Sequence, residues 1–294
     1  MLMTTTLDNH VRTVLSALTE TEQVMTAASV PSPRLAAEWL VAGVLGCPRL
    51  AVFTRSDTAL TEPEQVLLGA YTARAARHEP VQYILGETEF MGLRIGCDPR
   101  ALIPRPETEV MTAMVVDDLR RSGSAHPAIV DVGTGTGCVA LALAAALPQA
   151  RVTALDVDAS TLALARENGK QLELSDRVHF QQGDLLAGFD HASADVIVAN
   201  LPYIATDEWA TLSVGVRDFE PRRALDGGVS GLDYIERLAV QAFSVLVPEG
   251  RIYLEIGADQ GPSAHALLEA AGFSPVSIHS DWTRRDRIVK GVKS

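Results

Sequence analysis

Four consecutive residues at positions 200–203, Asn-Leu-Pro-Tyr, are the clearest candidates for a chemical function in this chain. They follow the apolar run 196–199, so they stand where a buried strand is expected to end. The side-chain oxygen of Asn200 and a backbone carbonyl can accept the hydrogens of a planar NH₂ group, while Tyr203 covers its face. Alone, the same string also fits an ordinary turn. A glycine-rich stretch upstream, residues 131–137, favours transfer of a methyl group to a nitrogen.

The glycine-rich stretch has the spacing Asp-x-Gly-x-Gly-x-Gly and follows a predicted strand. Glycines allow the backbone to turn sharply and to approach a ligand closely. A dinucleotide fingerprint would need a glycine where Cys138 stands, and the lysine of a Walker loop is absent. The spacing resembles that of class I S-adenosyl-L-methionine-dependent methyltransferases. We therefore expect this cofactor to contact Asp131, Gly133, Thr134, Gly135, Thr136 and Gly137.

Two further acids follow predicted strands. Asp156 can accept both ribose hydroxyls, as acids do in related dinucleotide folds, although it also fits a surface acid at a strand end. Asp184 can accept a hydrogen bond from the adenine amino group while Leu185 packs on the ring. The alternative interpretation of Asp184 is a helix N-cap. Asp131 is best placed to orient the loop or the methionine ammonium. Carboxyl ends of parallel strands meet at one edge, so Asn200 is expected beside the cofactor as well.

From residue 128 onward, predicted strands and helices alternate, which indicates a mostly parallel seven-stranded sheet with helices on both faces. The last two strands leave little room for a helix between them, so we expect an antiparallel hairpin at one edge. The predicted strands are 128–132, 151–155, 177–181, 194–199, 250–256, 274–279 and 286–291. The predicted helices are 138–147, 159–171, 231–247 and 260–271, with an earlier one from Glu107 to about residue 121.

Residues 7–79 are predicted to form a small all-α domain. Ser32 and Pro33 are typical of a helix start, and Thr61 with Glu64 has the pattern of a capping box. Between this domain and the sheet, residues 81–103 with Tyr83, Ile84 and three glycines suggest a short β-hairpin. The apolar stripes expected to face the helical core are Leu7, Val11, Val14, Leu15 and Leu18; then Leu35, Trp39, Leu40 and Val44; then Val66, Leu67, Ala70 and Tyr71.

Bulk properties narrow the class of protein. The 294 residues are 47% apolar, enough for a packed core without disulfides. A net charge of −12 argues against a broad phosphate-binding surface, so no direct nucleic-acid binding is expected. The three cysteines match neither a metal site nor a disulfide framework, and no signal peptide or membrane span is evident. We expect a cytoplasmic protein without a metal.

Beyond the superfamily, the chain resembles the protein-(glutamine-N5) methyltransferases that modify peptide-chain release factors, the PrmC/HemK-like family. The resemblance rests on residues 80–86, Phe90, 102–109, 131–137, 200–203, 219–221, 224–225 and 231–233. It implies an N-terminal helical substrate-docking domain over residues 1–80, a β-hairpin linker over 81–104 and a Rossmann-like methyltransferase domain over 105–294. The implied substrate is the glutamine of a Gly-Gly-Gln loop in a release factor.

Within this resemblance, Asn200, Pro202 and Tyr203 are the expected catalytic residues, and Asn200 to Tyr203 the substrate-binding ones. The family usually has Asn-Pro-Pro-Tyr, whereas Leu201 stands at the second position here. A residue before proline remains extended, so the carbonyl of Leu201 is still expected to face the acceptor. Glu107 and Glu109 are possible helpers for proton removal, although both also fit acids at a helix start.

Two alternative functions remain open from the residues alone. Asn-Leu-Pro-Tyr is also similar to the motif of RNA adenine dimethyltransferases, so an adenine-N6 methyltransferase acting on RNA or DNA is the first alternative. A non-catalytic protein that binds S-adenosylmethionine or handles heme is the second. The flanking family segments and the acidic charge favour a protein substrate.

Overall fold

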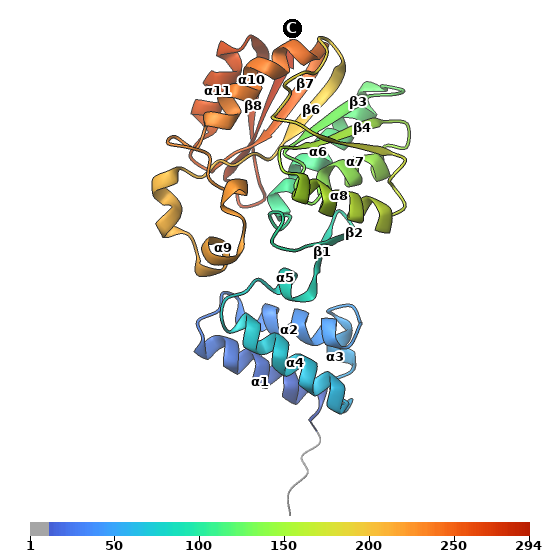
Figure 1. The fold of residues 1–294 in the computed structure, drawn as a ribbon, viewed down its shortest axis with the longest axis vertical. Helices are drawn as coiled ribbons and strands as arrows, with labels where there is room; N and C mark the ends of the chain where they lie inside the picture. Colours follow the sequence, from blue (N-terminus) through green and yellow to red (C-terminus); the bar gives the residue numbers. More distant parts are fainter. Residues whose placement is uncertain (1–11) are drawn as a thin grey trace, which may run out of the picture. The chain divides into compact units, whose positions relative to one another are not determined.

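The structure is a computed structural model that describes residues 12–294. The chain divides into two compact units, one ending at Leu85 and the other running from Gly86 to Ser294 (Figure 1). We call them the helical unit and the sheet unit. The predicted residues Leu7 and Val11 lie outside the described part of the chain.

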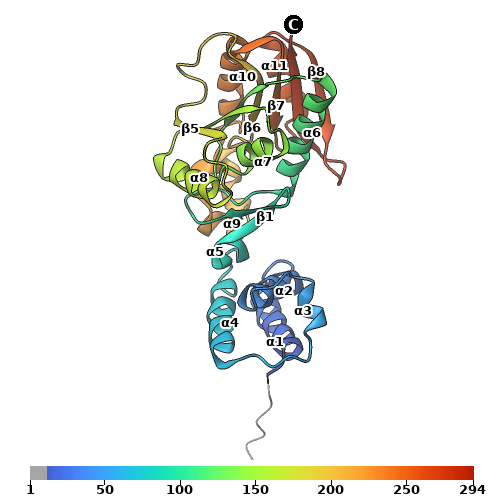
Figure 2. The ribbon, with the colours of Figure 1, turned by 90° about the vertical axis from the view of Figure 1, so that its right-hand side faces the viewer.

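The helical unit packs its helices around one apolar core (Figure 2). Its helices are α1 (Val14–Ala27), α2 (Pro33–Val44), α3 (Ala51–Thr54), α4 (Glu62–Ala75) and α5 (Val81–Leu85). The predicted capping box is present at the start of α4, where the backbone N–H of Thr61 donates to Glu64 Oε2 at 2.7 Å. Fully buried side chains of Leu18, Leu40 and Leu68 contribute to the core.

Several apolar residues predicted to face this core lie at the surface instead. In α4, Val66 is 68% and Leu67 40% exposed, whereas Leu68 is fully buried. Three consecutive apolar residues leave the phase of a helix undecided, since each step turns the side chain by about 100°. Ser32 stands at the N-cap position of α2, but its side chain makes no capping hydrogen bond. The other misassigned core residues are Leu15, Leu35, Trp39 and Ala70.

The segment predicted as a β-hairpin begins as a helix. Tyr83 and Ile84 lie in α5, where the carbonyl of Pro80 accepts from both of their backbone N–H groups. Proline at the start of a helix fixes a helical φ and needs no donor, which favours a helical turn here. The hairpin itself is present, formed by the antiparallel strands β1 (Glu87–Phe90) and β2 (Leu93–Gly96).

The sheet unit contains the predicted seven-stranded, mostly parallel sheet, in the order β5-β4-β3-β6-β7-β9-β8. Strand β9 pairs antiparallel with both β7 and β8, so the predicted antiparallel hairpin forms one edge. The order changes direction between β3 and β6, which is where open α/β sheets bind ligands. The strands are β3 (Ala128–Val132), β4 (Arg151–Asp156), β5 (Val178–Gln182), β6 (Ala194–Ala199), β7 (Leu246–Glu255), β8 (Phe273–Ser280) and β9 (Asp286–Lys293).

Helices cover both faces of this sheet, α6 and α7 on one and α10 and α11 on the other (Figure 1). The helices are α6 (Pro106–Ser122), α7 (Cys138–Ala146), α8 (Ala159–Gln171), α10 (Asp233–Val245) and α11 (Gly261–Ala270). Between β6 and α10 the chain forms three short helices: η1 (Thr206–Thr211), α9 (Val214–Phe219) and η2 (Arg222–Ala224).

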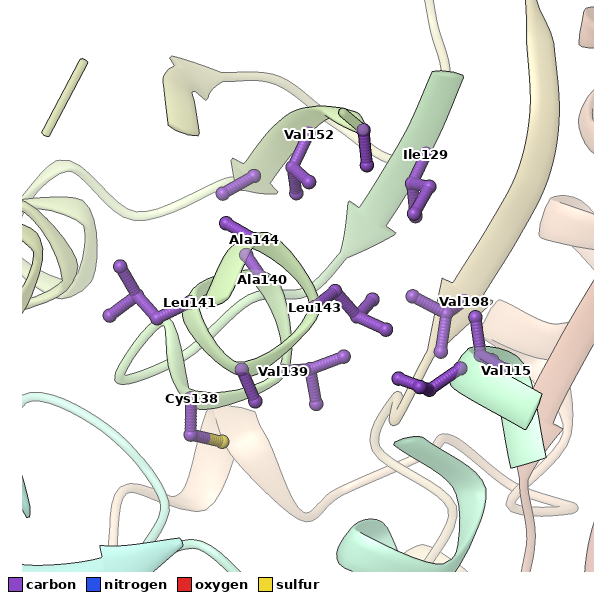
Figure 3. Close-up of a cluster of buried hydrophobic side chains, with 14 of the residues drawn as sticks. Val115, Ile129, Cys138, Val139, Ala140, Leu141, Leu143, Ala144, Val152 and Val198 are labelled. Carbon is purple, nitrogen blue, oxygen red and sulfur yellow. The ribbon is translucent and has the colours of Figure 1, made fainter. Parts of the chain in front are cut away.

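Alternation along each strand divides the apolar side chains between two cores. In β3, Ile129 belongs to the core under α7, whereas Val130 and Val132 belong to the core under α10. Figure 3 shows α7 within the first core, with Leu143 facing the sheet and Val115 of α6 and Val198 of β6 close by. Since α7 is buried almost all round, it fixes the glycine-rich loop that precedes it.

Candidate functional site

A cavity lies at the carboxyl ends of the central strands, and most of the predicted cofactor residues line it. They reach it from the segments after β3, β4, β5 and β6. The predicted residues in its wall are Asp131, Gly133, Thr134, Gly135, Thr136, Asp156, Asp184, Leu185, Asn200, Leu201 and Pro202. We call this space the strand-end cavity. Gly137 is not part of its wall; it is the N-cap residue of α7.

Asp131 holds the glycine-rich loop in place. Its Oδ2 accepts from the Thr134 hydroxyl at 2.6 Å and from the backbone N–H of Ala140 at 3.2 Å. Gly133 has a φ of +74°, and a β-carbon there would come within 2.9 Å of the Leu201 side chain. Burial raises the pKa of the Asp131 carboxyl to about 7. The loop therefore joins the end of β3 closely to the segment after β6.

The other two predicted acids differ in their surroundings. Asp156 accepts from the backbone N–H groups of Gly135 at 3.1 Å and Asp158 at 3.0 Å, and burial raises its pKa. Asp184 is exposed and forms an ion pair with Arg237 at 2.6 Å, a partner that the sequence did not indicate. No helix begins after Asp184, so it does not serve as a helix N-cap.

Leu185 and Val157 give the strand-end cavity an apolar side. Leu185 has a φ of +52°, an uncommon conformation for a leucine, and its side chain is buried. Unusual backbone conformations of this kind concentrate at ligand sites. Val157 lines the same cavity although 62% of it is exposed. The prediction missed Val157, for which the only sequence signal is its place directly after Asp156.

A second cavity adjoins the first, and Asn200 lines both. We call it the acceptor cavity. Tyr203 belongs to this cavity alone, and burial raises its pKa to about 12. Glu107 also lines it, whereas Glu109 lies in neither cavity and accepts from the backbone N–H of Met91 at 2.9 Å. The remaining wall consists mainly of the apolar residues Leu102, Ile204, Leu212, Val216, Ala224 and Leu225, with Arg105 and Arg287.

The side chain of Asn200 belongs to a series of hydrogen bonds that connects the end of β6 with α6 and the end of β7. Its Nδ2 donates to Thr108 Oγ1 at 3.0 Å, and the Thr108 hydroxyl donates to Glu255 Oε2 at 2.6 Å. Thr108 and Glu255 are both buried, and burial raises the pKa of Glu255 to about 7. Sequence reasoning assigned no role to either residue. An acid within the apolar run at the end of β7 is the sequence signal by which Glu255 could have been found.

The backbone at Tyr203 and Ile204 is held by the segment before α10 and by Gln260 at the start of α11. The Tyr203 carbonyl accepts from Gln260 Nε2 at 2.8 Å, and the Ile204 N–H donates to the Leu225 carbonyl at 3.0 Å. Gly231 has a φ of +71°, and a β-carbon there would collide with the Tyr203 carbonyl. These contacts bring Leu225 and Gly231, from the 224–225 and 231–233 segments, against the backbone that follows Asn200.

A buried ion pair connects the two segments that flank the acceptor cavity. Arg105 Nη2 lies 2.5 Å from Glu220 Oε1, and the backbone N–H of Ile103 donates to Glu220 Oε2 at 3.2 Å. The Glu220 side chain is only 1% exposed. A buried carboxylate requires such partners, since an unpaired charge would be strongly destabilising. The pair therefore links the 102–109 segment to the 219–221 segment.

Within residues 12–294, no group of three or more histidine, cysteine, aspartate or glutamate side chains is arranged to hold a metal ion. No helix of the described chain has the length and apolarity needed to cross a membrane.

The fold and the strand-end site together define a class I methyltransferase. Two solved structures share the fold at 18% identity and cover 80% of this chain: a methyltransferase from Pyrococcus furiosus, with a TM-score of 0.53, and the hMettl16 catalytic domain, with a TM-score of 0.54. At the family level, a sequence family described as the PrmC N-terminal domain matches residues 16–86, and one described as the methyltransferase small domain matches residues 106–217.

Curated relatives identify the particular family. Release factor glutamine methyltransferase of Deinococcus radiodurans is 39% identical over 277 residues, covering 94% of this chain and 97% of the relative. Those of Caulobacter vibrioides and Chlorobaculum tepidum are 36% and 39% identical, covering 96% and 95% of this chain and 97% of each relative. The chain belongs to the release factor glutamine methyltransferase family, which confirms the predicted resemblance.

Proposed function

We propose that this protein transfers a methyl group from S-adenosyl-L-methionine to the side-chain N5 of the glutamine in the Gly-Gly-Gln loop of a peptide-chain release factor. The observation that carries the proposal is the position of Asn200, which lines both the strand-end cavity and the acceptor cavity. One cavity suits a nucleoside cofactor and the other a planar amide, and they meet at the residue predicted to hold the amide. Membership of the family supplies the substrate class.

The residues of the strand-end cavity fit the proposed cofactor chemically. Asp156 offers a carboxylate for the ribose hydroxyls, and Asp131 a second one toward the amino-acid end. Leu185 and Val157 offer apolar surface for the adenine ring. Asp184 can accept from the adenine amino group through the oxygen that Arg237 does not use. When bound, S-adenosylmethionine supplies an electrophilic methyl group on a sulfonium.

The acceptor cavity provides the means to position a weak nucleophile. An amide nitrogen reacts poorly because its lone pair is delocalised, so orientation must provide much of the rate, up to roughly 7–11 kcal/mol. Asn200 Oδ1 and a backbone carbonyl of the tetrapeptide accept the two amide hydrogens, and these hydrogen bonds strengthen as positive charge develops on the nitrogen. Tyr203 covers the face of the amide, and Glu107 is the carboxylate in the cavity wall.

The release factor is proposed to dock through residues 1–80, with residues 81–104 as the linker to the methyltransferase domain at 105–294. Among residues 12–294, those that line the two cavities all lie beyond Leu85, in the sheet unit. The helical unit exposes apolar side chains, including Leu50, Val66 and Leu67, which a protein partner can cover. With a release factor as the substrate, we propose that the reaction takes place in the cytoplasm.

A transfer assay with isotopically labelled cofactor tests the function. The full chain is incubated with an intact release factor, with the same release factor whose loop glutamine is replaced by alanine, and with tRNA or rRNA. We expect label only in the unmodified release factor. Label in RNA adenine without label in the release factor would favour the adenine-N6 alternative. Cofactor binding without transfer to any acceptor would favour a non-catalytic protein.

A further inference from the structure

The hydrogen bonds that connect Asn200, Thr108 and Glu255 have a donor-to-acceptor direction that follows from the chemistry of the three side chains. An ionised Glu255 can only accept, so the Thr108 hydroxyl donates its single proton to Glu255, at 2.6 Å. The Thr108 oxygen is then left as an acceptor for Asn200, 3.0 Å away. The group of Asn200 that donates is its NH₂, so its oxygen is turned away from Thr108.

We infer that Thr108 and Glu255 are positioning residues that orient the Asn200 side-chain amide, presenting its oxygen to the substrate nitrogen. This inference rests on the proposed function, because it concerns an acceptor that carries NH₂ hydrogens. With the opposite orientation, Asn200 would present hydrogens to the hydrogens of the substrate, and no hydrogen bond would form. The two hydrogen bonds therefore favour the productive orientation of the Asn200 amide over the unproductive one.

The positions of the two residues suit this task. Thr108 lies in the first turn of α6 and is 3% exposed, and Glu255 ends β7 and is 2% exposed. Both side chains are therefore fixed by packing in two different elements. A buried carboxylate is costly for stability, and this one forms no ion pair among the described contacts of residues 12–294. A role in orienting Asn200 gives the reason for a charge at this place.

The inference also predicts a dependence on pH. Burial raises the pKa of Glu255 to about 7, although the hydrogen bond from Thr108 lowers it. Among the nearby charges, Glu107 raises this pKa, and Arg287 and Arg105 lower it. The titratable Tyr203 also interacts with Glu255. Below a pH of about 7 the protonated Glu255 carboxyl can donate to Thr108, which frees the Thr108 proton for the oxygen of Asn200. The unproductive orientation then gains a hydrogen bond, so kcat falls as the pH drops through about 7.

Substitutions of Thr108, with a matched control, test whether its hydrogen bonds orient the Asn200 amide. Thr108→Val keeps the shape but removes the hydroxyl, so we expect kcat to fall roughly ten- to hundredfold through misplacement of the amide. Thr108 also lines the strand-end cavity, but valine keeps the shape of the wall and leaves Asp156 and the glycine-rich loop untouched, so cofactor affinity by calorimetry should change less than about threefold. Thr108→Ser restores the hydroxyl and should recover most of kcat. The control Thr112→Val removes another buried hydroxyl from α6, one that donates only to the Thr108 carbonyl, and should leave kcat unchanged.

The pH profile of Glu255→Gln provides a second, independent measurement if Thr108→Val fails to fold. The profile is measured as kcat at saturating cofactor. Asp131 also has a pKa of about 7 and lines the strand-end cavity, so its titration could otherwise change the profile through cofactor binding. The parent should lose activity below pH 7, and the variant should lack this step. A Thr108→Val variant within twofold of the parent, or an unchanged pH step in Glu255→Gln, would overturn the inference. If the parent methylates a release factor in the same assays, such a result leaves the proposed function standing.

Discussion

At the scale of single residues, the site separates binding from chemistry. Asp156 contacts only the strand-end cavity, whereas Asn200 lines both cavities. Asp156→Ala removes the acceptor for the ribose hydroxyls, so we expect cofactor binding to weaken by about 1–3 kcal/mol. Calorimetric titration with S-adenosylmethionine checks this value, and an affinity equal to that of the parent would remove Asp156 from the cofactor site.

Asn200→Ala is expected to have the opposite profile. Turnover should fall roughly 10²–10³-fold, as with the loss of one preorganised polar group, while cofactor affinity stays nearly intact. Steady-state kinetics on a release factor, with calorimetry alongside, measure the two effects separately. Turnover within a few-fold of the parent would contradict the role proposed for Asn200.

Leu201 is where this chain departs from the usual family motif, and its side chain is buried against Gly133 in the strand-end cavity. It does not line the acceptor cavity. We therefore expect Leu201→Pro to retain glutamine methylation and to leave RNA unmodified. Parallel assays on a release factor and on RNA decide the matter. A change of acceptor in the variant would mean that the leucine side chain shapes an adenine slot.

At the scale of elements, the segment before α10 supports the tetrapeptide. Gly231→Ala should displace the Tyr203 carbonyl, because its φ of +71° and the close approach leave no room for a β-carbon. We expect a loss of kcat that exceeds any loss of cofactor affinity. The control is Gly69→Ala in α4, where nothing lies within 4 Å of the added carbon and a gain of roughly 0.5–1 kcal/mol in stability is expected. Unchanged kcat in Gly231→Ala would show that the support is dispensable.

The sequence was most informative where a pattern is local. Alternating strands and helices, the capping box and the glycine loop all depend on neighbours within a few residues, and the structure contains each of them. The predicted apolar face of α4 was wrong because Val66, Leu67 and Leu68 are all apolar, and only Leu68 is buried in the core. The prediction that Tyr83 belongs to the β-hairpin was wrong. Pro80 starts a helical turn there, whereas the aromatic and β-branched composition favoured a strand.

The missed parts of the site depend on contacts between distant segments. Thr108 and Glu255 are 147 positions apart, and Arg105 and Glu220 are 115 apart. Such pairs follow from the register of strands and the angle of α6, which no local pattern specifies. The strand-end acids were predictable for a different reason: parallel strands bring their carboxyl ends together whatever the details of packing.

At the scale of the whole molecule, the proposed docking role of the helical unit has a measurable consequence. Fixing a flexible Gly-Gly-Gln loop costs about 1–2 kcal/mol per residue, which contacts elsewhere on a folded release factor must offset. An intact release factor should therefore be a much better substrate than its excised loop peptide. Replacing Val66 and Leu67 by serine should raise KM for the intact factor but not for the peptide. Val240→Ser, an exposed valine of α10, is the control.

Kinetics on both substrates distinguish docking from a general effect. Equal efficiency of the parent on peptide and intact factor would show that the helical unit has no docking role. A rise in KM for both substrates in the α4 variant would instead indicate a disturbed fold, which thermal unfolding of the same variant would reveal.

Mapping the modified atom tests the central claim most directly. An intact, unmethylated release factor is incubated with the full chain and S-adenosylmethionine, digested, and analysed by tandem mass spectrometry. We predict one added methyl group on the side-chain nitrogen of the glutamine in the Gly-Gly-Gln loop, and none when Asn200 is replaced by alanine over the same time. A methyl group on any other residue, or no methyl group on the release factor under conditions in which the protein binds the cofactor, would contradict the account.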